Sequence, residues 1–185
     1  MITTTHVILN ATILGSKKHP ERNWPIVLGA ALPDSPTFLV LFSPLYCSLG
    51  ISRQLNYAFF QTCTDWFHSI PLALVGLLLC LPFRFSSGIY FFISVTLHDL
   101  EDLPVHAQFA HRQFLPFSQY AFHSPISYWE PQYHANLVAP AEWLLVIACA
   151  ACLWRRNLNS FAQLSLILVI IFQGTLLLYF LGIRW

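Results

Sequence analysis

The sequence is dominated by long apolar runs that short polar segments separate. Five runs are candidates for membrane-spanning helices: Trp24–Leu45, Trp66–Phe83, Gly88–Leu103, Ala141–Trp154 and Ala162–Leu181. Only 9% of the residues are charged, whereas a soluble domain carries about 25%. The runs must therefore face lipid or one another, and we predict an all-α, polytopic membrane helix bundle with about five spans.

The chain is expected to form a single membrane-embedded domain with four parts. These are an N-terminal helix and basic turn (1–23), site-bearing spans (24–105), an interfacial loop (106–140) and scaffold spans (141–185). The apolar helix expected over Met1–Gly15 is short for a full span, which needs about 20 residues, so it could lie at the interface or re-enter. The interfacial loop is rich in aromatic side chains, which favour an ordered layer at the membrane surface.

Charge limits both the partners and the orientation. The formal net charge of +1 gives no reason to expect a nucleic-acid partner, and the expected partner is membrane lipid. Basic residues are uneven across the five-span arrangement: Lys17, Lys18, Arg22, Arg84, Arg155 and Arg156 fall on one side, and Arg53, Arg112 and Arg184 on the other. The positive-inside rule makes the first side cytoplasmic. The interfacial loop is then non-cytoplasmic, in what we expect to be a bacterial inner or plasma membrane.

The strongest candidate for chemistry closes the third apolar run. His98 and Asp102 are four residues apart and share one face of a helix, and Pro104 is expected to end that helix. An imidazole and a carboxylate one turn apart can offer two ligands to one metal ion. The alternative interpretation is a charge cluster at a helix end near the membrane surface.

Further carboxylate and imidazole groups interrupt the first two spans. Asp34 lies among prolines that break a helix, and a carboxylate at membrane depth is a candidate functional group. Asp65 and His68 open the second span, three residues apart. Helix N-caps would explain both aspartates without a site. We predict that six side chains converge on one or two divalent ions: His6, Asp34, Asp65, His68, His98 and Asp102.

The order of these motifs resembles that of bacterial membrane-bound, predicted metal-dependent hydrolases of the LexA-regulated hydrolase group. The matching residues are His6, Pro33-Asp34, His68-Ser69 and His98 through Asp102, within the first two-thirds of the chain. The chain departs from the family twice, because the early motif lacks a second aspartate and Asp65 stands where the family has a histidine. The segment 110–131 looks like a cyanobacterial branch of membrane proteins.

The resemblance implies a hydrolase of a phosphoester or lipid that uses zinc or a similar divalent ion. Such an ion lowers the pKa of bound water toward about 7 and polarises the scissile group. Asp99 or Glu101 is then the expected catalytic base, and His111 and Arg112 are expected to hold an anionic substrate. Two alternatives stay open: a non-enzymatic membrane protein that binds or passes metal ions or protons, and a degenerate hydrolase kept as a scaffold.

Overall fold

The computed structural model describes residues 1–42, 53–156 and 158–180, and within these ranges the chain is helical, with no strand. The α-helices are α1 (Thr3–Leu14), α2 (Asn23–Ala31), α3 (Ser35–Phe42), α5 (Arg53–Phe67), α6 (Ile70–Cys80), α7 (Ser86–Asp102), α8 (Ala135–Trp154) and α9 (Ser160–Phe180). Short 3-10 helices cover Pro20–Arg22, Leu103–Val105 and Pro131–Tyr133. The predicted all-α class is confirmed for this part of the chain.

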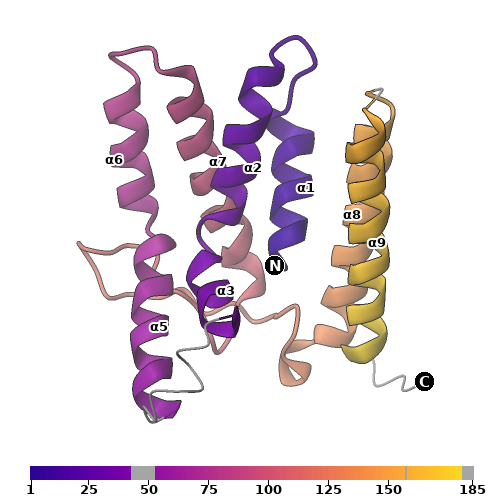
Figure 1. The fold of residues 1–185 in the computed structure, drawn as a ribbon. Coiled ribbons are helices and arrows are strands. Elements are labelled where there is room, and N and C mark those ends of the chain that lie inside the picture. Colours follow the sequence, from indigo (N-terminus) through magenta and orange to yellow (C-terminus); the bar gives the residue numbers. More distant parts are fainter. Residues whose placement is uncertain (43–52, 157, 181–185) are drawn as a thin grey trace.

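The helices α2 and α7 form the centre of the bundle (Figure 1). Helix α6 packs against α7, α1 packs against α2, and α8 packs against both α1 and α9. Gly29 permits the central contact, because a Cβ at this position would lie 2.3 Å from the carbonyl oxygen of Phe91 on α7. The close approach of α2 and α7 brings the residues at the end of α2 next to those on α7.

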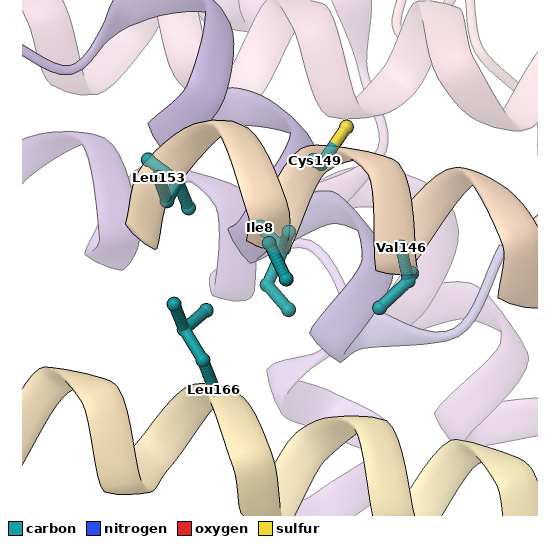
Figure 2. Close-up of a cluster of buried hydrophobic side chains, with 6 residues drawn as sticks. Ile8, Val146, Cys149, Leu153 and Leu166 are labelled. Atoms are coloured by element: carbon teal, nitrogen blue, oxygen red, sulfur yellow. The ribbon is translucent and has the colours of Figure 1, made fainter. Parts of the chain in front are cut away.

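Helix α1 is attached to α8 and α9 by apolar packing and by one cation. Figure 2 shows the apolar cluster, which consists of Ile8 from α1, Val146, Cys149, Ala150 and Leu153 from α8, and Leu166 from α9. At the C-terminal end of α1, the Arg156 guanidinium donates to the carbonyl oxygens of Ala11, Thr12 and Gly15 at 3.2, 2.7 and 3.0 Å. The expected N-terminal helix is therefore present and firmly docked.

Two helices, α8 and α9, are long and apolar enough to cross a membrane. The residues Phe59–Phe67 and Ile70–Cys80 pass the same test together, with a bend of 41° between them. Large apolar side chains on α8 and α9 point outward: Leu144 is 61% exposed and Ile171 is 60% exposed. These features are consistent with association with a membrane.

Two or three candidate spans are fewer than the five that the sequence predicted. The run Trp24–Leu45 is split, because α2 ends at Ala31 and α3 starts at Ser35, with the prolines around Asp34 interrupting the hydrogen-bond ladder. The run Gly88–Leu103 forms α7, which has 17 residues and ends in three acidic groups. Both runs are helical, but neither is one long apolar helix.

Two expected boundaries were wrong. Residues 46–65, between the first two expected spans, were not expected to form a helix, but from Arg53 onward they belong to α5; residues 43–52 lie outside the described residues. The interfacial loop was expected to reach Pro140, but α8 begins at Ala135 and contains that proline. The helix α8 therefore begins six residues before the expected start at Ala141 and includes Pro140, which removes one backbone donor without ending the helix.

The connections α1–α2, α6–α7 and α8–α9, which carry six basic residues, lie at one end of the bundle, at the top of Figure 1. The segment 106–134 runs past the opposite ends of the helices. It is bonded to the start of α6, where Ile70 N donates to Gln113 O at 3.0 Å and Ser69 Oγ donates to Leu115 O at 2.5 Å. It is also bonded to the end of α7 through Ser124 Oγ, which donates to Pro104 O at 2.6 Å.

Candidate metal centre

Five of the six predicted ligands meet in the middle of the molecule, each supplied by a helix or a helix break. Helix α7 carries His98 and Asp102 one turn apart, and α1 carries His6. Asp34 lies in the break between α2 and α3, and His68 lies in the bend between α5 and α6. The packing of α1, α2 and α6 around α7 thus brings separate segments to one point.

Four atoms at this point face one another at distances close to those between ligands of one metal ion. His68 Nε2 lies 3.6 Å from Asp34 Oδ1 and 3.5 Å from Asp102 Oδ2. His98 Nε2 lies 3.9 Å from the same Asp34 oxygen and 3.4 Å from the same Asp102 oxygen. Bonds of about 2.0–2.2 Å to a tetrahedral ion put neighbouring ligand atoms about 3.3–3.6 Å apart. These distances are also too long for direct hydrogen bonds of good geometry.

The two imidazoles are oriented by backbone carbonyls. His68 Nδ1 donates to Thr64 O at 2.8 Å, and His98 Nδ1 donates to Ala30 O at 2.7 Å. In the neutral ring the other nitrogen then carries a lone pair, and both Nε2 atoms are buried with no hydrogen-bond partner among the described residues. Fixing Nδ1 in this way is the usual arrangement of a metal-bound histidine.

His6 approaches from α1 and, unlike His68 and His98, has a carboxylate at hydrogen-bond distance from each ring nitrogen. Its Nδ1 lies 2.7 Å from Glu101 Oε2, and its Nε2 lies 3.0 Å from Asp102 Oδ1. Its ring stacks on that of His98, with centroids 3.6 Å apart. Glu101, which was expected to be a catalytic base, therefore contacts a ligand candidate and orients it. A carboxylate behind a histidine raises the basicity of the nitrogen that faces the ion.

Two histidines of the 106–134 segment complete the surroundings. His111, expected to bind substrate, stacks on His68 with ring centroids 3.9 Å apart, and burial lowers its pKa to about 4. Its neutral imidazole is thus able to act as a ligand near neutral pH. His106 Nε2 lies 3.2 Å from Asp102 Oδ1. Sequence reasoning gave no role to His106, although its four-residue spacing from Asp102 was a signal.

Three overlapping groups have ligand atoms within 4.8 Å of one another: His6, His98 and Asp102; Asp34, His68 and His98; His68, Asp102 and His111. Asp102 belongs to two of them and faces the ligands with both oxygens. The whole set is larger than one tetrahedral ion requires, so the arrangement has room for one or two ions.

Asp65 lies beside this centre but outside the three groups. Its carboxylate accepts a hydrogen bond of 2.6 Å from Arg112 Nε, and His111 Nδ1 lies 3.6 Å from it. Arg112 also donates from Nη1 to Gln119 Oε1 at 2.7 Å. The expected substrate-binding arginine is therefore partly engaged in holding Asp65 and the loop.

The centre has an excess of negative groups. Asp34, Asp99, Glu101 and Asp102 lie within or beside it, and both carboxylate oxygens of Asp99 are buried without a hydrogen-bond partner among the described residues. A cationic contact comes from the amino group of Met1, which meets Asp102 Oδ1. Burying unbalanced carboxylates costs several kcal/mol per ion, so the arrangement calls for added positive charge.

Comparison with known proteins finds no matching family model, no similar curated protein and no similar solved structure. Helices suited to a membrane and a buried His/Asp cluster able to hold a metal ion are thus the features that bear on function.

Proposed function

We propose that this chain is a membrane-bound metal-dependent hydrolase with a His/Asp centre. The observation that carries the proposal is the pair of Nε2 lone pairs, on His68 and His98, which face the carboxylates of Asp34 and Asp102. With both imidazoles neutral, the converging nitrogen and oxygen atoms are all acceptors and repel one another. A divalent cation held by these residues would remove that repulsion.

Zinc is the proposed ion, because imidazole and carboxylate ligands at this spacing suit its tetrahedral geometry. Such an ion supplies an activated water and polarises the bond to be cleaved. Asp34 is the proposed side of entry, because its side chain is 19% exposed whereas those of His68 and His98 are 1% and 0% exposed. A substrate and its water would then arrive at the break between α2 and α3.

The chain's own residues have separate proposed roles. Asp99, buried and without hydrogen-bond partners among the described residues, is the proposed base that takes a proton from the attacking water. Arg112 is 34% exposed and lies beside the centre, and its guanidinium suits an anionic group such as a phosphoester. The reaction class itself rests on the resemblance of the motifs to membrane-bound hydrolases.

The second candidate is a non-enzymatic protein that binds or passes metal ions. One observation favours it: two histidines and two aspartates face one another. If all four bound one ion, the site would be closed, as is typical of structural rather than catalytic zinc. A degenerate hydrolase that serves as a scaffold would lack the ion.

The proposed setting is a bacterial inner or plasma membrane, with the centre and the 106–134 segment toward the non-cytoplasmic face. The basic connections at the opposite end of the bundle support this orientation. The proposal of five spans requires that α2, α3 and α7 lie at membrane depth, where α6, α8 and α9 would separate them from lipid.

Metal analysis of the purified protein tests the proposal. We expect stoichiometric zinc in the wild type and its loss in His98→Ala. His123→Ala is the matched control, because His123 Nδ1 also donates to a backbone carbonyl, at 2.7 Å, but lies outside the ligand groups. Zinc-dependent cleavage of bis(4-nitrophenyl) phosphate would support the hydrolase, and bound zinc without any cleavage would favour the binding protein. A wild type free of metal would refute both.

A further inference from the structure

A polar cluster lies where α1 meets α8 and α9, the two helices that are long and apolar enough to cross a membrane. Glu142 of α8 is 7% exposed and Gln173 of α9 is 2% exposed. Both helices are candidate spans. Buried polar side chains in such helices are costly unless they are hydrogen-bonded, and those at membrane depth usually have a function.

Glu142 binds the first turn of α1. Its Oε1 accepts hydrogen bonds from Ile2 N at 2.8 Å and from the Thr5 hydroxyl at 2.5 Å. The first N–H groups of a helix have no partner inside the helix, and no side chain of α1 caps this end. A carboxylate there also interacts favourably with the helix dipole. Glu142 therefore caps α1 from a neighbouring helix.

Gln173 strengthens the same contact. Its Nε2 donates to the hydroxyls of Thr4 and Thr5 at 2.6 and 3.0 Å. The remaining oxygens, Glu142 Oε2 and Gln173 Oε1, are buried without hydrogen-bond partners among the described residues. Both residues line a cavity of about 10 Å³, which has room for about one water molecule. One water could donate to both oxygens and complete the cluster.

The capped turn leads directly into the metal centre. Thr5, which Glu142 and Gln173 both contact, precedes His6 in the chain. The position of this turn along the α1 axis decides whether His6 Nε2 reaches Asp102 Oδ1, which lies 3.0 Å away. We propose that Glu142 is a positioning residue of the metal centre and acts on His6 through the first turn of α1. This inference rests on the metal-binding part of the proposed function.

Zinc affinity, measured by competition with a chromophoric chelator in detergent, tests the inference. Glu142→Leu is expected to weaken zinc binding by about 10- to 100-fold, the range found when groups behind metal ligands are removed. Glu142→Gln is the matched control and is expected to stay within about threefold of the wild type, because its amide oxygen can still accept from Ile2 and Thr5. Thr5→Val is a milder change and is also expected to weaken zinc binding.

A double-mutant cycle separates positioning from general damage. In a His6→Ala background, Glu142→Leu and Thr5→Val are expected to cause no further loss of zinc affinity, because the ligand on which they act is gone. Equal losses with and without His6 would overturn the inference, as would a Glu142→Leu variant that binds zinc like the wild type. If Glu142→Leu does not fold, the Thr5→Val cycle decides. A wild type that binds no zinc refutes the proposed function and the inference together.

Discussion

At a pH where His68 and His98 are neutral, Asp34→Asn should stabilise the metal-free protein, and it should weaken metal binding. Asp34 Oδ1 and Asp102 Oδ2 lie 3.6 and 3.5 Å from the same atom, His68 Nε2, so they are at most about 7 Å apart. Two negative charges at this separation repel by about 2 kcal/mol at an effective dielectric constant of about 20. The substitution removes this repulsion. Its amide nitrogen can donate toward His68 Nε2, while its oxygen keeps the hydrogen bond from Thr3 Oγ1.

Zinc should reverse the effect of Asp34→Asn on stability. At a free concentration 1,000 times its Kd, a ligand stabilises the native state by about 4 kcal/mol. If the loss of one ligand weakens zinc binding about 100-fold, the same concentration stabilises the variant by only about 1.4 kcal/mol. The zinc-induced increase in stability is therefore expected to fall to about a third of its wild-type size.

Thermal unfolding in detergent, followed by tryptophan fluorescence with EDTA or with zinc, measures both effects. A gain of about 2 kcal/mol corresponds to a rise of about 4–8 °C in Tm for a chain of this size. Asp65→Asn is the control: it removes the negative charge that pairs with Arg112 and should lower Tm in both conditions without changing the zinc-induced shift. A lower Tm for Asp34→Asn in EDTA, with a wild-type zinc shift, would refute the charge argument.

Three further outcomes are expected. Gly29→Ala should lower the free energy of unfolding by about 1–3 kcal/mol, because the new Cβ would clash with Phe91 O. Gly174→Ala, whose Cβ would have its nearest neighbour at 3.4 Å, should melt like the wild type. Equal melting temperatures for the two variants would contradict the close α2–α7 contact. Amide exchange should be slow at Ser124 and Ser127, which donate to His106 O and Tyr133 O at 2.9 and 2.8 Å; rapid exchange throughout 106–134 would show that the segment is not ordered. In a cysteine-free background, Tyr120→Cys and Phe83→Cys, at positions 59% and 82% exposed, should be labelled from opposite sides of the membrane, and labelling from one side would contradict the orientation.

The parts of the site that could be predicted from sequence are those set by local geometry. A four-residue spacing on an apolar helix places His98 and Asp102 on one face whatever the rest of the chain does. Prolines around Asp34 interrupt a helix through the loss of backbone donors, which is also a local effect. These two features were enough to locate the centre on α7 and opposite the α2–α3 break.

The remaining features depend on contacts between distant segments. Arg112 meets Asp65 across 47 positions, and Glu101 meets His6 across 95; no spacing rule predicts such pairs. His111 was expected to hold an anionic substrate, and nothing in the sequence indicated that its ring stacks on His68. The number of candidate spans was overestimated because each apolar run was interpreted as one helix. A break shortens the helix but leaves the run equally apolar, so composition does not reveal the break.

The two ends of α1 depend on side chains from the far part of the chain. Glu142 binds its first turn and Arg156 its last, and Ile2 and Glu142 are 140 positions apart. During synthesis α1 therefore leaves the ribosome long before its caps exist, while His68, His98 and both ligand aspartates are complete by residue 102. A chain stopped after residue 134 should accordingly bind zinc only as well as His6→Ala does, and wild-type affinity in that fragment would refute this order of events. His6, on the first helix, would then be the last ligand to take its place, so that the complete centre forms only after α8 has been synthesised and packed against α1.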